Sequence, residues 1–450
     1  MIRFGYIIIS IAFFLIVCGI TSSVPAAPMS RQLQAQAGVE RFPPPDFVES
    51  GYELPSPTTP HPRQNIYEYV DAVVLLAALG LASYLVLKKR SRRAILTLSV
   101  FSLFYFGFWR KGCVCSIGAI QNIVLSIFDR DYAVPFVVVV FFLLPLVFTL
   151  FFGRTFCAAV CPLGAVQDLV LLRPVAVPSW LESGLRLFAY AYLGAAVLFA
   201  ATGSAFIICR YDPFISFFRL SGSLNILVLG GCFLLVGVFI GRPYCRFFCP
   251  YGVILRQLSR LSKWRVSITP DDCIKCRLCE DSCPFGAIKV PTAEWPARDY
   301  DKSKKRLALL LLLLPILILA CAWAVSTASD LMSRTHPTVR LADRIHLEET
   351  GKEEETTDAS AAFWATGKDV RELYAEASNI QAAVKTGSWL LGGFLGLVIA
   401  LKLIGHSVRR TRIDYEADRA GCLACGRCFE YCPREHVRLN KDKQAVGDGE

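Results

Sequence analysis

Long apolar blocks alternate with short polar and charged segments along most of this chain. Each block is bounded by charges or glycine and approaches the roughly 17 to 25 apolar residues that a helix needs to cross a bilayer. After an apolar N-terminal stretch, the blocks cover about residues 68–87, 94–109, 133–152, 186–208, 224–241, 306–325 and 387–405. The pattern predicts an all-α polytopic membrane bundle with about seven spans.

The N-terminal segment has the features of an export signal. Residues 1–26 combine Arg3 with an apolar stretch to about Ile20 and a small-residue cleavage site near Ala26. We expect a signal peptide, with a retained membrane anchor as the alternative. Residues 27–66 are rich in proline and polar residues and lack periodicity. They therefore predict an exported, poorly structured arm.

Basic residues beside the apolar blocks set the direction of the chain. Residues 88–93, after the first span, contain five lysines and arginines, and Arg409, Arg410 and Arg412 follow the last span. Such clusters stay in the cytoplasm. Alternation then places 153–185, 242–305 and 406–450 in the cytoplasm, and 110–132, 209–223 and 326–386 on the other side. The pattern predicts a multi-pass protein of a bacterial inner membrane.

Composition agrees with a membrane location and points to metal. Hydrophobic residues make up 54% of the chain and charged residues 19%, against about a quarter in ordinary globular proteins. The formal net charge is +11, but the basic residues cluster beside apolar blocks, so nucleic acid is not an expected partner. The 18 cysteines are too clustered for random core positions and too few for a disulfide scaffold, which indicates metal binding.

Two cysteine runs carry the strongest chemical signal. Residues 273–284 and 422–433 both read C-x2-C-x2-C-x3-C-P, the bacterial ferredoxin run whose fourth cysteine binds the cluster of the other run. We therefore predict two [4Fe-4S] clusters with crossed ligation. The first has Cys273, Cys276, Cys279 and Cys432 as ligands, and the second has Cys422, Cys425, Cys428 and Cys283. Structural zinc sites are the alternative, but they normally lack the C-x3-C-P tail.

The two runs lie far apart in the sequence but should share one module. The first run lies in residues 266–300 and the second in the tail, 406–450. Between them come a span (306–325), a predicted exported loop (326–386) and another span (387–405). A shared two-cluster module requires both runs on one face, and the charge pattern independently places both in the cytoplasm. Reducing cytoplasm also suits thiolate-bound clusters.

A repeated segment lies within the membrane bundle, residues 67–265. The copies FGRTFCAAVCPLGAVQDL, from Phe152, and IGRPYCRFFCPYGVILRQL, from Ile240, share Gly-Arg, an aromatic residue and C-x3-C-P. Each could present two thiols on one helical face. The four cysteines are Cys157, Cys161, Cys245 and Cys249. They predict a third iron-sulfur centre, with Arg154 and Arg242 offsetting thiolate charge, or alternatively paired free thiols that act as a redox switch.

A fainter third copy of this repeat, CVCSIGAIQN, starts at Cys113. It places Cys113 and Cys115 on the predicted outer face, where Cys209 also lies. These three cysteines form an outer redox site in one interpretation and are buried small hydrophobic residues in the other. Cys18, Cys232 and Cys321 lie inside apolar blocks and are interpreted as packing residues.

Missing motifs narrow the function. The chain has five histidines, of which only His406 lies near a span, so we expect no haem in the bundle. No glycine-rich nucleotide-binding motif follows a predicted strand, so no nucleotide cofactor is expected.

With these motifs, the chain resembles the membrane polyferredoxins of the NapH/NosR type over about residues 68–440. The resemblance rests on the two ferredoxin runs and the paired GR-x-[FY]-C-x3-C-P segments. It implies that these twelve cysteines serve in moving electrons between the quinone pool or cytoplasmic donors and periplasmic partners. Flavoprotein members carry an exported domain with FMN on a threonine in an S-G-A-T-like motif, and neither is found in this sequence. A flavin partner would therefore be a separate flavoprotein.

The leading hypothesis is an oxidoreductase electron-transfer subunit, similar to a quinol dehydrogenase, which links the quinone pool or cytoplasmic donors to a periplasmic redox protein. The alternatives are a maturation factor for copper or iron-sulfur enzymes, since related proteins with C-x3-C-P segments act in oxidase assembly, and a redox sensor.

Overall fold

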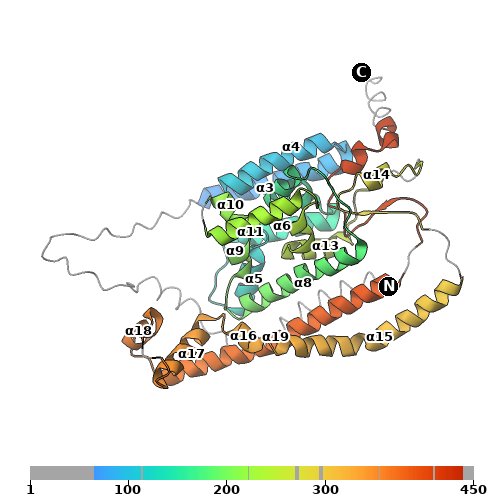
Figure 1. The fold of residues 1–450 in the computed structure, drawn as a ribbon. Coiled ribbons are helices and arrows are strands. Elements are labelled where there is room, and N and C mark those ends of the chain that lie inside the picture. The colour runs from blue at the N-terminus through green and yellow to red at the C-terminus, as the bar shows by residue number, and fades with distance from the viewer. Residues whose placement is uncertain are drawn as a thin grey trace.

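The computed structural model describes residues 65–112, 115–220, 222–268, 273–292, 297–353, 355–408 and 411–438. The predicted N-terminal signal or anchor and nearly all of the predicted exported arm lie outside these residues. The described chain is mostly helical, with one two-stranded sheet, and its helices form a membrane-type bundle and a long hairpin that packs against it (Figure 1).

The bundle runs from residue 65 to residue 259. Its helices are α3 (Asn65–Tyr84), η3 (Leu85–Lys89), α4 (Arg92–Ser102), η4 (Leu103–Trp109), α5 (Ala119–Phe128), α6 (Phe136–Phe152), η5 (Phe156–Val160), α7 (Pro162–Leu169), α8 (Ser179–Ala201), α9 (Ile207–Tyr211), α10 (Ile215–Arg219), α11 (Leu224–Gly237), α12 (Pro243–Phe247) and α13 (Pro250–Ser259). The elements η3, η4 and η5 are π-helical turns, which occur often at functional sites.

Within the described residues, four helical segments are long and apolar enough to cross a membrane. They are Ile66–Lys89, Ser179–Ala201, Lys302–Ser326 and Val370–Ser407, and they overlap four of the seven predicted spans. The predicted spans 133–152 and 224–241 fall on the shorter helices α6 and α11, and 94–109 falls on α4 and η4. The structure therefore supports a polytopic membrane protein with four long candidate spans, and the count of seven stays a prediction.

The chain after the first ferredoxin run forms a long antiparallel hairpin. Its two arms are α15 (Ala297–Ser326) and α19 (Val370–Ser407), which lie side by side in Figure 1. Small residues let the two backbones approach. A Cβ on Gly396 would lie 2.9 Å from the Ile318 Cα, and a Cβ on Gly392 would lie still closer to the Cys321 carbonyl oxygen. The spacing Gly-x3-Gly is typical of tightly packed membrane helices. Cys321 thus lies at a packed helix contact.

Residues 326–386, predicted as a loop, are largely helical. They contain α16 (Ser329–Ser333), α17 (Pro337–Glu349), α18 (Asp358–Ala365) and the first half of α19. Val339, Ala342, Ile345 and Phe363 form a small apolar core with residues of α19, so this segment packs as a unit. Figure 1 shows α16–α18 at one end of the hairpin and the ferredoxin elements toward the other.

The ferredoxin runs form one small module. Its elements are α14 (Leu278–Asp281), β1 (Ile288–Lys289), β2 (Glu416–Ala417) and α20 (Arg427–Glu430). The strand after the first run pairs antiparallel with the strand before the second, with Ile288 opposite Ala417. The N–H of Asp418 also donates to the Ala287 carbonyl oxygen at 2.7 Å. Segments about 130 residues apart in the sequence are thereby joined.

We expect reporter fusions to place the two ends of the α15–α19 hairpin on opposite sides of the membrane. Fusions at about residue 300 and after residue 440 should report cytoplasm, and one near residue 360 should report the exported side, because basic clusters stay in the cytoplasm. Alkaline phosphatase and green fluorescent protein fusions at the same three positions give the measurement. A cytoplasmic signal near residue 360 would contradict this orientation.

Candidate metal centres

A cavity lies between the two ferredoxin runs. Its lining includes the four cysteines expected to hold the first cluster, Cys273, Cys276, Cys279 and Cys432. The loop before α14 is tightly wound, because Lys275 and Arg277 adopt left-handed conformations with φ of 55° and 67°. Ala424 and Gly426 take the same conformation at matching positions of the second run, with φ of 56° and 77°. The two runs therefore fold alike.

The four cysteines expected to hold the second cluster also gather. Cys283 and Cys422 pack against a buried group that contains Phe285 and Cys425. Burial raises the pKa of the Cys428 thiol well above its usual value, and the nearby thiols of Cys422, Cys425 and Cys283 add to the rise. Deprotonating such buried thiols requires a compensating cation, which a metal cluster supplies.

The residues themselves distinguish a cluster from structural zinc. Both runs carry the C-x3-C-P tail of bacterial ferredoxins, which structural zinc sites normally lack. Among the described residues, no three Cys, His, Asp or Glu side chains are arranged around a single point as ligands of one ion are. The iron-sulfur interpretation therefore rests on the spacing of the cysteines and on the fold of the two runs.

Crossed ligation predicts which cluster a single substitution damages. In a Cys432→Ser variant, the cluster whose other ligands are Cys273, Cys276 and Cys279 should lose its signal, since Cys432 lines the same cavity. Electron paramagnetic resonance of the purified variant gives the measurement, with Cys422→Ser as the matched control. Loss of the same signal in both variants would show that each run keeps its own cluster.

Each C-x3-C-P segment forms a short helical hairpin, made of η5 and α7 in the first and of α12 and α13 in the second. The ends of both hairpins face the ferredoxin module. In the first hairpin, Arg154 Nη1 donates to the Ala420 carbonyl oxygen at 3.4 Å, and Asp168 accepts from Arg92 at 3.4 Å. In the second, Arg246 donates to the Pro284 carbonyl oxygen at 3.4 Å and Ser259 to the Arg419 carbonyl oxygen at 2.9 Å. The turn of each hairpin, with its Cys-Pro, therefore lies farther from the module than the hairpin ends.

The helical face expected for each cysteine pair is replaced by a helix break. Cys157 lies in η5 and Cys245 in α12, but Cys161 and Cys249 are N-cap residues of the next helices, α7 and α13. The following prolines occupy the first helical position, where the missing N–H costs nothing. A proline inside a helix would cost a hydrogen bond, so the chain turns at each Cys-Pro and the next helix begins there.

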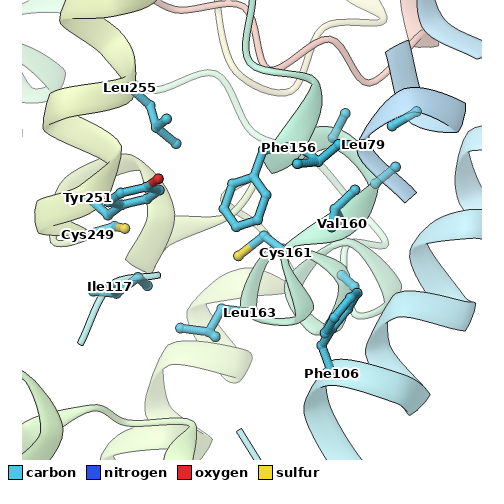
Figure 2. Packing of buried hydrophobic residues seen from close by; sticks show 14 of the residues in the cluster. Leu79, Phe106, Ile117, Phe156, Val160, Cys161, Leu163, Cys249, Tyr251 and Leu255 are labelled. Carbon is cyan, nitrogen blue, oxygen red and sulfur yellow. The ribbon is translucent and has the colours of Figure 1, made fainter. Parts of the chain in front are cut away.

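The four thiols of these hairpins nevertheless come together, and we call them the proximal set: Cys157, Cys161, Cys245 and Cys249. Burial raises the pKa of Cys161 and Cys249, and in both cases Cys245 and Cys157 are among the thiols that add to the rise. Figure 2 shows Cys161 and Cys249 within one buried group with Phe156 and Tyr251. The proximal set thus forms a buried concentration of four sulfur ligands.

Three N–H groups donate to sulfur atoms of the proximal set. Gln167 Nε2 lies 3.2 Å from Cys245 Sγ, Arg154 Nη2 lies 3.7 Å from Cys157 Sγ, and the Gly252 N–H lies 3.3 Å from Cys249 Sγ. Burial raises the pKa of Cys245 to about 11, but Arg242 and Gln167 oppose this rise. Hydrogen bonds to sulfur stabilise thiolates and set the potentials of iron-sulfur clusters. The sequence analysis did not identify Gln167 as part of the site.

The two arginines of the repeat have different partners. Arg154 contacts a thiol, as expected, but Arg242 is fully buried and forms a two-pronged ion pair with Asp168 at 3.0 and 2.8 Å. Arg242 also donates to the carbonyl oxygens of Cys157 and Ala158. Its charge is matched by Asp168, so its main contribution is to tie the two hairpins together.

The proximal set adjoins the second ferredoxin set. Cys157 packs against the same buried group as Cys283 and Cys422. Arg92 joins the two regions, since it donates to the Cys425 carbonyl oxygen at 3.1 Å and to Asp168 at 3.4 Å. The membrane-side thiols and the ferredoxin thiols therefore form one contiguous region.

Of the expected outer cysteines, Cys113 lies outside the described residues. Cys115 and Cys209 both lie beside Gly118, where a Cβ would be 3.1 Å from Cys209 Sγ and 3.8 Å from the Cys115 carbonyl oxygen. Burial raises the pKa of Cys115 to about 12, and Asp212 and Cys209 contribute to the rise. The structure therefore brings two of the three residues together. Cys232 is exposed on α11, away from these groups.

Comparison with known proteins identifies the same segments. A family model described as a 4Fe-4S binding domain matches residues 134–178 and 223–269, which contain both C-x3-C-P hairpins. A second 4Fe-4S binding domain matches residues 266–289, the first ferredoxin run. 4Fe-4S binding domains therefore match both C-x3-C-P hairpins of the bundle and the first run of the ferredoxin module. No solved structure matches the chain.

Three relatives illustrate the group. The putative electron transport protein YccM of Escherichia coli is 27% identical over 31% of this chain and 43% of its own length. NirI of Paracoccus denitrificans is 33% identical over 31% of this chain and 22% of its own. The regulatory protein NosR of Pseudomonas aeruginosa is 28% identical over 48% of this chain and 33% of its own. The chain is therefore similar to membrane polyferredoxins of the NapH/NosR type. The match spans less than half of each relative.

Proposed function

We propose that this polyferredoxin is an inner-membrane electron-transfer subunit that links quinol or cytoplasmic donors to a periplasmic redox partner, such as a reductase system or a separate flavoprotein. When bound, [4Fe-4S] clusters supply one-electron chemistry. The observation that carries the proposal is the contact between the proximal set and the second ferredoxin set through Cys157. A membrane-embedded ligand set beside a soluble one is what electron transfer into the membrane requires.

The chain's own residues would hold three centres in series. The first and second are the two crossed ferredoxin sets, and the third is the proximal set. Cys279 and Cys428, from the two ferredoxin sets, pack around one shared apolar group, and Cys157 connects the second set to the proximal set. Contact between neighbouring ligand sets supports a continuous route for electrons from the module to the bundle.

The surroundings of the proximal set exclude water and hold its charge. Cys161 and Cys249 lie in the main apolar core with Phe156, Tyr251 and Leu163 (Figure 2). Gln167 and Arg154 donate to sulfur and favour the charged thiolate form. Such a site suits a redox centre that exchanges electrons without exposure to solvent.

Redox titration of the purified full chain tests the function. We expect a reduced menaquinol or ubiquinol analogue, or a cytoplasmic-type reductant such as reduced ferredoxin, to reduce the iron-sulfur signals of protein in liposomes. An artificial oxidant confined to the opposite side of the membrane should then reoxidise them. Protein that holds its clusters but passes no electron across the liposome membrane would contradict the proposal.

A further inference from the structure

The proximal hairpins have counterparts that enter the core from the other end of the bundle. The segment CSIGAIQ, from Cys115, aligns with CPLGAVQ, from Cys161, and ICRYDP, from Ile208, aligns with YCRFFCP, from Tyr244. In the second pair the chain is one residue shorter, and Asp212 precedes the proline where the proximal copy has Cys249. Figure 1 shows α9 and α10 at the end of the bundle away from α14.

The contacts repeat as well as the sequence. Gln121 Oε1 accepts from the N–H of Ile208 at 2.9 Å, and Gln167 Oε1 accepts from the N–H of Tyr244 at 3.1 Å. Ile208 and Tyr244 are the residues immediately before Cys209 and Cys245. The backbone after the first cysteine of each segment also matches. The N–H of Ala119 donates to the Cys115 carbonyl oxygen and the N–H of Ala165 to the Cys161 carbonyl oxygen, both at 3.0 Å. Segments α5 and α9 therefore pack as α7 and α12 do.

The turn at Cys115 and the proximal hairpin turn at Cys249 both contact helix α6. Ser116 Oγ donates to the Phe141 carbonyl oxygen at 2.8 Å, and the Tyr251 hydroxyl donates to the adjacent Phe142 carbonyl oxygen at 2.7 Å. The Phe141 carbonyl lacks its helical partner because residue 145 is proline. Cys115 packs against the same apolar core that contains Cys161 and Cys249. The distal turns therefore adjoin the proximal set.

Three potential ligands gather at the distal turns, and we call Cys115, Cys209 and Asp212 the distal set. Asp212 is 2% exposed, and the Phe214 N–H donates to its Oδ1 at 2.9 Å. A carboxylate that is buried to this extent carries its charge at a cost in free energy unless a cation or further donors compensate it. A buried carboxylate beside two thiols is an unusual arrangement for packing alone, but thiolates and carboxylates are both ligands of iron.

An unsatisfied hydroxyl lies between the two sets. Tyr244 is 2% exposed, and its hydroxyl has no hydrogen-bond partner among the described residues. The Tyr244 ring packs edge-on against Phe214, two residues after Asp212, with ring centroids 5.6 Å apart, and Tyr244 directly precedes Cys245. A buried hydroxyl without a partner costs free energy unless a bound group accepts from it. Its position points to a ligand between the hairpin turns.

We propose that the distal set holds a further iron-sulfur centre, which exchanges single electrons with a centre on the proximal set. The inference rests on the proposed function for the proximal set and extends the route toward the far side of the membrane. Each step transfers one electron and forms or breaks no bond. The matching sequence and contacts of the distal turns and the proximal hairpins favour the same kind of centre, a cluster, at both sites. Asp212 supplies a carboxylate where the proximal set has a thiolate.

Metal analysis of the purified full chain is the first test. A Cys115→Ser/Cys209→Ser variant should lose about four iron atoms per chain, the content of one cubane, and keep its ferredoxin signals. Cys232→Ser/Cys321→Ser is the matched control, since neither cysteine belongs to a ligand set, and should lose none. Full iron content in the distal variant, together with loss of iron when the proximal cysteines are replaced, would overturn this inference and leave the proposed function intact. Full iron content in both variants would overturn both.

Substitution of Asp212 separates a ligand from a structural residue. Asp212→Cys should keep the iron and change the resonance spectrum and midpoint potential of one centre only, because a thiolate replaces a carboxylate. Asp212→Asn keeps an acceptor for the Phe214 N–H, and should lower the iron content or change the same signal. Unchanged iron, spectrum and potential in both variants would exclude Asp212 from the ligand set.

Discussion

Replacing the four cysteines of the proximal set by serine should remove about four iron atoms per chain, the content of one cubane, and abolish electron transfer from quinol. Serine is a poor ligand for an iron-sulfur cluster, and Cys157 provides the contact with the second ferredoxin set. Without a centre at this position, the route from the module into the bundle is interrupted. The effect on electron transfer should therefore be close to complete.

The measurement combines iron and sulfide analysis with quinol-dependent reduction in liposomes. The ferredoxin signals should persist in the quadruple variant, because their eight cysteines lie outside the hairpins. The Cys232→Ser/Cys321→Ser variant controls for the loss of membrane cysteines in general. Unchanged iron in the quadruple variant, together with titratable free thiols at these four positions in the wild-type protein, would instead support the redox-switch interpretation of these residues.

The ferredoxin runs could be predicted from the sequence because their information is local. The spacing C-x2-C-x2-C-x3-C-P fixes a tight loop, and the structure shows the required left-handed residues at Lys275 and Arg277. The grouping of the two C-x3-C-P segments could also be predicted, because the repeat implies equivalent positions. Gln167 could not be assigned in the same way, since its contact with Cys245 depends on how α7 packs against α12.

The number of spans stays a prediction because the chain also enters the core and turns back. Hydropathy reports apolar surroundings but does not distinguish a span from a hairpin buried in the bundle. The helices α6 and α11 are accordingly shorter than typical spans, at 17 and 14 residues. The segment 326–386 was expected only as an exported loop between two spans, so the sequence analysis did not assign its helices. The spacing of Val339, Ala342 and Ile345, three residues apart along one helix face, was the available signal for α17.

The ion pair between Arg242 and Asp168 gives the largest expected effect on stability. Both side chains are almost fully excluded from solvent, with 0% and 1% exposed. Burial would raise the pKa of Asp168, but Arg242 outweighs burial and holds this pKa below its usual value. Each charge therefore stabilises the other, and without Arg242 the buried Asp168 carboxylate keeps only its longer contact with Arg92, at 3.4 Å.

An Arg242→Met variant should be destabilised by about 3–5 kcal/mol, the usual consequence of breaking a buried ion pair. Arg242→Met/Asp168→Leu should recover part of this loss, because the buried carboxylate is removed as well. The recovery should be incomplete, since Arg242 also donates to the carbonyl oxygens of Cys157 and Ala158. Thermal unfolding in detergent gives the comparison. The control is Arg173→Met, since Arg173 is exposed and lies in a segment that is also predicted to face the cytoplasm. Equal destabilisation by the single and double variants would show that Arg242 acts through the backbone carbonyls alone.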